Sequence, residues 1–282
     1  MCLGHSEANN QHAQWLLEIG ARSTMDNNEM IQVPQSMICA NLNGLINRIY
    51  PGIGNSRAQD NQYFLDHIIL CSRNDQVHDI NEAILQQFNP TAEVHMLRSV
   101  DSVSKEDGMH YAYPVEFLQQ LNAGGLPFAL LCLKVGSSVI LLRNLDPGEG
   151  LCNGTRIVVL NVRRKVLQYR VISKDRRFRG KVVLIPRIRL SPNTETLPMP
   201  LKRLQFPVRL AFAMTINKSQ GQSVEHVGIN LQISVFFHRQ LYVAFSKCTL
   251  SLNISVLLSE QSQESRRTLN VVYKEVFNSI TL

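Results

Sequence analysis

The chain has 282 residues, of which 44% are hydrophobic and 18% charged, and its formal net charge is +7 at pH 7. This length can form two domains of ordinary size, and so apolar a composition argues against a disordered chain. The six cysteines are scattered without a CxxC pair, which argues against a structural zinc site and favours a reducing compartment. The amino-terminal residues lack the pattern of a signal peptide, and no apolar run is long enough to span a membrane.

The first part of the chain mixes helical and strand patterns. Apolar residues recur at helical spacing over 11–19 and over 41–50, which predicts two amphipathic helices. An apolar run over 64–71 predicts a buried strand, and it leads through a polar turn into a helix over 76–88. Strand, turn and helix in this order are the unit of a parallel α/β sheet. Residues 95–126, rich in Ser, Asp and Gly, are expected to form a surface connection.

From residue 131 onward the hydrophobic period changes to two, the period of a strand. Short strands separated by polar turns are predicted at 139–142, 157–160, 167–171 and 182–190. Several short strands within about sixty residues predict a small closed barrel. After a proline-rich connector, further elements are predicted as strands at 208–214, 226–231 and 254–258 and as helices at 237–245 and 269–280. The barrel is therefore expected to be inserted in an α/β domain that resumes after it.

Positive charge is concentrated in residues 151–210, which hold 15 of the 29 Lys and Arg residues but only two acidic residues, Asp175 and Glu195. So uneven a distribution predicts a surface that binds a polyanion, although a simple solvated face is the alternative. Arg187 and Arg189 alternate on one face of a predicted strand and are candidate contacts. Aromatic residues are sparse in this block, which favours contact with phosphates over stacking of bases.

A polar motif, TINKSQGQ at residues 215–222, stands between an apolar run and the next predicted strand. Backbone amides, hydroxyls and an ammonium packed this densely suit contact with phosphate oxygens, although a helix cap between core strands is the alternative. The sequence contains no GxxxxGK[ST] loop and no acidic pair closing an apolar strand. It therefore lacks both patterns that grip a triphosphate and its Mg²⁺.

Four segments carry a recognisable pattern: 131–146 (LCLKVGSSVILLRNLD), 150–156 (GLCNGTR), 205–222 (QFPVRLAFAMTINKSQGQ) and 240–246 (QLYVAFS). Together they resemble the PIF family of ATP-dependent DNA helicases, most nearly the branch carried by Helitron transposons. Weaker likeness extends upstream, so that the resemblance covers nearly the whole chain.

The resemblance implies an α/β fold. It would comprise a RecA-like (P-loop NTPase-type) second helicase domain with an inserted small SH3-like β-barrel, preceded by a helical remnant of the first RecA-like domain. We expect the remnant and a linker at 1–60, the first part of the second domain at 61–130, the basic barrel at 131–205 and the motif-bearing remainder at 206–282. Matched to the family, the sequence begins downstream of the catalytic motifs of the first domain.

The resemblance also implies roles for individual residues. It implies contacts to single-stranded DNA from Asn74, Thr215, Asn217, Lys218 and Ser219. The positive charge of residues 151–210 adds Arg187 and Arg189 as candidate contacts. Positions near the nucleotide fall on Gln220, Gly221 and Gln222. Lys247 occupies the position of the family's arginine finger, where an ammonium lacks the planar two-pronged donor of a guanidinium and is expected to impair turnover. No metal-binding residue is expected. Reversing the charges of Arg187 and Arg189 together is expected to weaken DNA binding and to leave the fold intact.

The function expected from the resemblance is that of a partial ATP-dependent 5′-to-3′ DNA helicase that contributes DNA contacts and one side of the ATP site. ATP and Mg²⁺ are expected only when the missing first RecA-like domain is supplied. The expected partners are single-stranded DNA and that domain, without a membrane, in the nucleus. Three alternatives stay open: a non-catalytic nucleic-acid-binding module, a degenerate transposon remnant, and a scaffold whose basic face binds an acidic protein.

Overall fold

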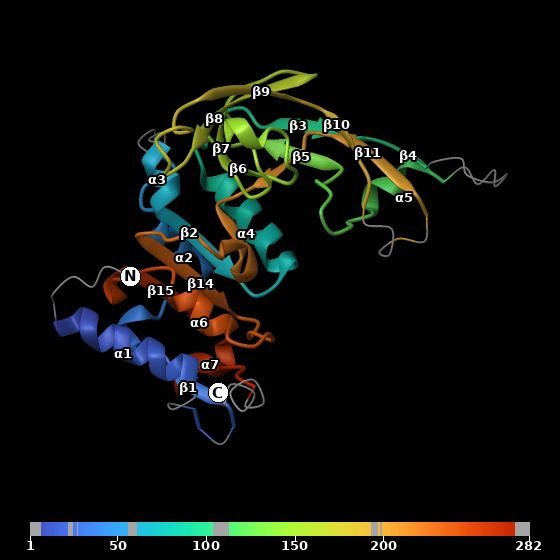
Figure 1. Ribbon diagram of the computed structural model, residues 1–282. Coiled ribbons are helices and arrows are strands. Elements are labelled where there is room, and N and C mark those ends of the chain that lie inside the picture. The colour runs from blue at the N-terminus through green and yellow to red at the C-terminus, as the bar shows by residue number, and fades with distance from the viewer. Residues whose placement is uncertain are drawn as a thin grey trace, which may run out of the picture. The chain divides into compact units, whose positions relative to one another are not determined.

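The computed structural model describes residues 7–21, 25–26, 28–55, 61–103, 113–192, 197 and 199–273. The chain folds as two compact units (Figure 1). Unit 1 comprises residues 1–57, 63–84 and 212–282, and unit 2 comprises residues 58–62 and 85–211. Within the described ranges, no helix is both long enough and apolar enough to cross a bilayer.

The centre of unit 1 is a four-stranded parallel sheet in the order β13-β2-β14-β15. Its strands are β2 (His67–Cys71), β13 (Ala213–Thr215), β14 (His226–Leu231) and β15 (Ile254–Leu258). Every residue of β15 is buried, as expected for a parallel strand covered on both faces. In the register of the sheet, Thr215 and Asn230 both lie beside Cys71. The carboxyl ends of β13, β2 and β14 therefore meet at one edge.

Helices surround this sheet. Those wholly or mainly in unit 1 are α1 (Glu7–Ala21), α2 (Leu42–Ile49), α3 (Asn61–Asp66), α4 (Asn74–Gln87), α6 (Gln240–Phe245) and α7 (Glu260–Ser265), with 3₁₀ turns η1 (Gln35–Met37), η4 (Ile216–Ser219) and η5 (Ser251–Asn253). Asn41 caps α2, because its side-chain oxygen accepts a hydrogen bond from the Gly44 amide at 2.8 Å. Helix α2 packs on β14 and β15. A Cβ at Gly228 of β14 would lie 2.9 Å from Ile49, so this close packing requires glycine.

Three expected elements differ in the structure. Residues 64–66 continue α3, and only 67–71 form a strand, since a short apolar run does not distinguish the two by its period. The expected surface connection contains β3 (His95–Arg98), β4 (Val100–Val103) and α5 (Val115–Gln120). Of the expected terminal helix, Leu269 is instead the last residue of β16 (Arg267–Leu269), which pairs with β1 (Met30–Gln32), and residues 270–273 are not helical. The part of that helix beyond residue 273 lies outside the described residues.

Unit 2 is built from antiparallel sheets in the strand orders β12-β6-β7-β8-β9, β10-β11-β4 and β3-β5. The strands not yet given are β5 (Leu130–Leu133), β6 (Ser138–Leu141), β7 (Arg156–Val162), β8 (Val166–Ile172), β9 (Val182–Pro186), β10 (Ile188–Leu190), β11 (Leu201–Gln205) and β12 (Val208–Leu210), and η3 (Pro147–Glu149) is a 3₁₀ turn. Val139, Ile157 and Tyr169 lie in the buried core of the five-stranded sheet. In the described part of the chain β9 and β12 are its two edges, so the closed barrel stays a prediction.

Part of the recognisable pattern, residues 144–155, folds into a tight loop. The side-chain oxygen of Asn144 accepts a hydrogen bond from the Asn153 amide at 2.8 Å, and the Thr155 hydroxyl donates to the Gly150 carbonyl at 2.8 Å. Gly150 has a φ of +77°, and a Cβ there would lie 2.6 Å from the ring of Phe178. These residues shape the loop, and their role is structural.

Gly150→Ala is expected to lower the free energy of unfolding by about 1–3 kcal/mol, because the added methyl overlaps the Phe178 ring in a left-handed backbone. Gly154→Ala is the matched control: its φ is +92°, yet nothing lies within 4 Å of a Cβ there. Urea denaturation of both variants separates the two causes. An equal loss in the two would show that backbone conformation alone matters and that the Phe178 contact does not.

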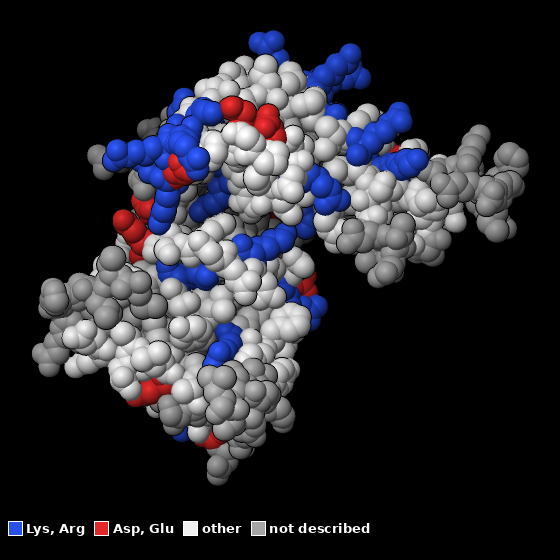
Figure 2. Space-filling model, viewed as in Figure 1, with Lys and Arg blue, Asp and Glu red and all other residues white. Residues whose placement is uncertain are grey.

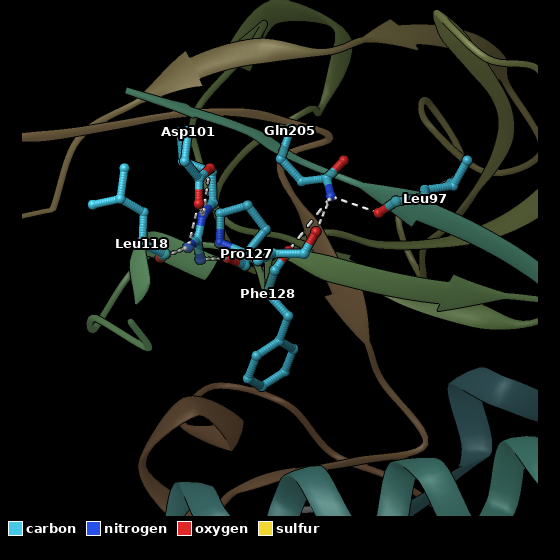
Figure 3. A network of polar contacts seen from close by, with 8 residues as sticks. Leu97, Asp101, Leu118, Pro127, Phe128 and Gln205 are labelled. Carbon is cyan, nitrogen blue, oxygen red and sulfur yellow. Dashed lines mark hydrogen bonds and ion pairs between the residues drawn. The ribbon is translucent and has the colours of Figure 1, made fainter. Parts of the chain in front are cut away.

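A buried ion pair joins two strands of unit 2. The guanidinium of Arg203 on β11 is 0% exposed, and its Nε and Nη2 lie 2.8–3.1 Å from the carboxylate of Asp101 on β4. Nη1 donates to the Pro127 carbonyl at 3.0 Å and Nη2 to the Leu118 carbonyl at 2.9 Å. Figure 3 shows Asp101, Leu118 and Pro127 gathered around this network. The carboxylate and two carbonyls compensate the burial of the cation.

The burial of Arg203 corrects one expectation from the sequence. The cations of residues 151–210 were expected to form a surface that binds a polyanion. Arg203 and Arg156 are instead 0% and 5% exposed, and Nη2 of Arg156 donates to the Ala211 carbonyl at 3.1 Å. Gln205, two residues along β11, is also buried and donates to the Leu97 carbonyl at 2.8 Å (Figure 3). Part of the positive charge therefore holds strands together and is withdrawn from the surface.

Candidate nucleic-acid interface

A pocket of about 440 Å³ lies at the carboxyl edge of the unit 1 sheet. It is lined by the loop after β2, by the end of β13 with η4, and by the segment before α6, through Ser72, Arg73, Asn74, Asp75, Thr215, Asn217, Phe236 and Phe237. Ligands of open α/β sheets bind outside the carboxyl ends of the strands, where the connecting loops converge. The position of the pocket in the fold is therefore that of a binding site.

Gln240, the first residue of α6, links two walls of the pocket. Its side chain is buried, and its Oε1 accepts hydrogen bonds from the amides of Phe236 and Phe237 at 3.1 and 3.3 Å. Its Nε2 donates to the side-chain oxygen of Asn217 at 3.4 Å. Because only the carbonyl oxygen of an amide can accept from two N–H groups, these contacts fix the orientation of Gln240. They engage the oxygen of Asn217, which leaves its NH₂ group as the donor toward a ligand.

The first turn of α4 forms the opposite wall. Asn74 begins this helix of 14 residues, whose first amides carry a partial positive charge. One of them, the Gln76 amide, already donates to Oδ1 of Asp75 at 2.8 Å. Arg73 and Asp75 form an ion pair at 2.8 Å, with both side chains about half exposed. The Ser72 hydroxyl donates to the Ile233 carbonyl at 3.0 Å, which ties the loop after β2 to the loop after β14. Amide donors and a helix amino terminus suit an anion such as phosphate.

Two adjacent aromatic rings complete the pocket. Phe236 and Phe237 are 47% and 51% exposed, and their ring centroids lie 4.5 Å apart at an angle of 44°. Exposed rings beside anion-binding groups are what a single-stranded nucleic acid requires, because its bases stack while its phosphates are held. Neither ring is among the residues predicted from the sequence. The only local signal is a pair of phenylalanines directly before the pattern at 240–246.

A family described as "DNA helicase Pif1, 2B domain" matches residues 116–162, which run from α5 to the end of β7. The "ATP-dependent DNA helicase PIF1" of Danio rerio is 35% identical over 178 residues, which are 63% of this chain and 25% of that protein. Its human counterpart is 33% identical over 188 residues, which are 67% of this chain and 26% of that protein. This chain belongs to the Pif1 helicase family. It spans about a quarter of the length of these curated relatives.

Solved structures agree with this assignment. The crystal structure of a Pif1 helicase from Bacteroides in complex with ADP-AlF3 and ssDNA matches 99% of the chain, over 54% of its own length, with a TM-score of 0.60 and 21% identity. A Pif1 helicase from Candida albicans matches 84% of the chain, over 56% of its own length, with a TM-score of 0.53 and 20% identity. At this identity the likeness establishes the fold alone. The expected RecA-like α/β fold is thereby confirmed, and the family model and the curated relatives confirm the resemblance to the PIF family.

Three of the DNA contacts expected for a Pif1-family chain lie together. Asn74, Thr215 and Asn217 all line the pocket, although they come from two separate stretches of sequence. Lys218 follows on η4 with an exposed side chain. Ser219 is different: it is 1% exposed, and its hydroxyl donates to the Ile216 carbonyl at 2.6 Å. This hydroxyl closes the 3₁₀ turn, and the expected contact of Ser219 with DNA stays a prediction.

The positions expected near the nucleotide lie apart from the lining of the pocket. Gln220, Gly221 and Gln222 form an exposed or half-buried turn after η4, where Gly221 has a φ of +77°. The Val224 amide donates to the Lys247 carbonyl at 3.0 Å, so this turn runs beside the chain that leaves α6. Partial burial lowers the pKa of the Lys247 ammonium. The turn and Lys247, the position expected for the arginine finger, are thus neighbours in unit 1.

Unit 2 carries a basic face, with Lys and Arg side chains grouped around β8 and β9 (Figure 2). Arg189 is exposed. Arg187 is partly buried: its guanidinium lies 4.9 Å from the centre of the Phe206 ring and donates to the Arg98 carbonyl. A carboxylate at position 187 would meet the negative face of that ring and leave the carbonyl without its donor. The expectation that the charges can be reversed without disturbing the fold is therefore limited to Arg189.

Proposed function

We propose that this chain supplies the second RecA-like domain of an ATP-dependent 5′-to-3′ DNA helicase, and that the pocket of unit 1 holds single-stranded DNA. The strand-rich part of unit 2 would then be the inserted SH3-like barrel. One observation carries the proposal: Asn74, Thr215 and Asn217, assigned to DNA contact from different segments, line one pocket beside two exposed rings.

The chemistry of the pocket supports a polynucleotide better than a small anion. The NH₂ group of Asn217 and the first amides of α4 can donate to phosphate oxygens. Phe236 and Phe237 present exposed ring faces that a phosphate does not use and a base does. Asp75 adds one negative charge, which its ion pair with Arg73 offsets. Recognition would fall on backbone and ring faces, without preference for a base sequence.

Asn217→Asp tests the phosphate contact. The substitution replaces the outward donor with a carboxylate, so we expect the affinity for a fluorescent oligothymidylate to fall by about tenfold, corresponding to about 1.4 kcal/mol, measured by fluorescence anisotropy. Asn47→Asp, on the exposed side of α2, is the control with the same change in charge. Equal effects of the two variants would leave only net charge as the cause and would remove Asn217 from the interface.

In this proposal the chain provides one side of the ATP site and lacks the loop that grips the triphosphate. The turn at 220–222 and Lys247 could contact one side of a triphosphate, but the sequence holds no GxxxxGK[ST] loop to grip it. ATP and Mg²⁺ would therefore need the first RecA-like domain, and the chain by itself would be a DNA-binding module. We expect no ATP hydrolysis from residues 1–282, with or without oligothymidylate, in an assay of phosphate release. DNA-stimulated turnover, with a complete Pif1 helicase as positive control, would contradict this expectation.

A further inference from the structure

The strand β9 lies at one edge of the five-stranded sheet of unit 2. Its pairing partner is β8, and in the described part of the chain no strand pairs with its other side. Figure 1 shows β9 running along the outer side of this sheet. The backbone N–H and C=O groups on the outer side of such a strand can pair with another extended chain.

The outward face of β9 is apolar where an edge strand is usually charged. Val182 is 52% exposed and Leu184 is 66% exposed, whereas Ile185, on the opposite face of the strand, is 1% exposed and belongs to the buried core. Arg170 and Gln168 of β8 lie directly opposite Val182 and Leu184. Natural proteins protect edge strands with lysine, proline or a bulge. Pro186 does so only at the last residue of β9.

Lys and Arg residues lie at both ends of β9. The turn between β7 and β8 holds three exposed cations, Arg163, Arg164 and Lys165, and the pairing of Val166 with Pro186 places this turn at the end of β9. The loop that precedes Val182 holds five further cations: Lys174, Arg176, Arg177, Arg179 and Lys181. Asp175 and Glu149 form ion pairs with Arg177 and Lys181 at 2.7 and 2.6 Å. Figure 2 shows the predominance of basic side chains in this region.

We propose that β9 binds an extended acidic peptide segment of a partner protein as an additional antiparallel or parallel strand. The peptide backbone would pair with the outer edge of β9, its apolar side chains would cover Val182 and Leu184, and its carboxylates would meet the cations at the two ends. This site is independent of the DNA pocket of unit 1, and the inference does not rest on the proposed function.

Two other occupants fit the same surface less well. Single-stranded DNA gains from exposed aromatic rings. Tyr169, which pairs with Val183 of β9, is buried, and Phe178 is partly buried with the cations of Arg177 and Lys181 5.1 and 5.6 Å from its centre. DNA would also leave the aliphatic side chains of β9 without apolar partners. A second copy of the chain would bring two positively charged edges together, which is unfavourable.

The test uses a fluorescent peptide of alternating valine and glutamate, and a control peptide of the same sequence with N-methyl groups on every second residue. The N-methyl groups remove the backbone donors that strand pairing requires. We expect the complete chain to bind the first peptide at least about tenfold more tightly than the second, measured by fluorescence anisotropy.

Leu184→Lys is the decisive variant, because it removes an apolar contact while adding a positive charge. If strand pairing and apolar contacts hold the peptide, the affinity of this variant for the peptide falls by about tenfold despite the added charge. Leu252→Lys, at a leucine that is 80% exposed in unit 1, should leave it unchanged. Thermal unfolding checks that both variants are folded.

Four results would overturn the inference. Equal binding of the two peptides would show that charge alone attracts them. An unchanged or higher peptide affinity of Leu184→Lys would exclude the apolar face of β9. A dimer in sedimentation that Leu184→Lys dissociates would assign the edge to a second copy of the chain. Oligothymidylate that displaces the peptide and binds more weakly to Leu184→Lys would assign it to DNA.

Discussion

Asp101→Ala is expected to lower the free energy of unfolding by about 3–5 kcal/mol, because it leaves a buried guanidinium without its counter-ion. Arg203 is 0% exposed, so water does not replace the lost carboxylate. The Leu118 and Pro127 carbonyls still accept from this guanidinium, but they carry no formal charge. The loss is expected to be visible as a lower urea midpoint and a lower melting temperature.

Two controls separate burial from pairing. Asp175→Ala breaks an ion pair of the same chemical type at 2.7 Å, between side chains that are 79% and 37% exposed, and is expected to leave the urea midpoint unchanged because solvent screens it. Asp101→Leu combined with Arg203→Met removes both buried charges, and is expected to recover most of the stability that Asp101→Ala loses. If Asp175→Ala and Asp101→Ala were equally harmful, burial would not be the cause.

Replacing Phe236 and Phe237 together with alanine is expected to weaken the binding of oligothymidylate by about 10–100-fold, since stacking contributes about 1–3 kcal/mol per base. Both rings line the pocket and are about half exposed, so the substitution removes contact surface without opening a core. Phe117→Ala, at a ring that is 40% exposed on α5 of unit 2, is the matched control. Fluorescence anisotropy at one fixed salt concentration measures all of these affinities.

An abasic oligonucleotide distinguishes the phosphate contacts of the pocket from its aromatic rings. It keeps the phosphates and lacks the bases, so the double alanine variant is expected to bind it as well as the unchanged chain does. Asn217→Asp is expected to weaken binding of abasic and normal strands alike, because it acts on the phosphates. Loss of abasic binding in the double alanine variant would mean that the rings support the loop and do not stack bases.

The expected DNA contacts could be assigned from the sequence, but their proximity in space could not. Asn74, Thr215 and Asn217 could be proposed because the resemblance to the PIF family implies DNA contacts at these positions. That they lie together follows from the pairing of Thr215 with Cys71 in neighbouring parallel strands, which no local pattern states. Phe236 and Phe237 were not predicted, because a pair of phenylalanines between a strand and a helix is typical of a buried core. Their exposure depends on Gln240, which holds both of their amides from α6.

By itself the sequence determined the α/β order of elements, the membership of the Pif1 family and the total positive charge of residues 151–210. The order of elements and the charge depend on local periodicity and composition, and the family membership depends on the motifs along the chain. All of these are read without knowing what lies opposite each residue. Only the tertiary structure decided which cations reach solvent. Arg189 remains exposed, whereas Arg203, on a neighbouring strand of the same sheet, is buried against Asp101. The alternation of a strand gives the face on which a side chain lies, but the segment packed on that face comes from a distant part of the chain.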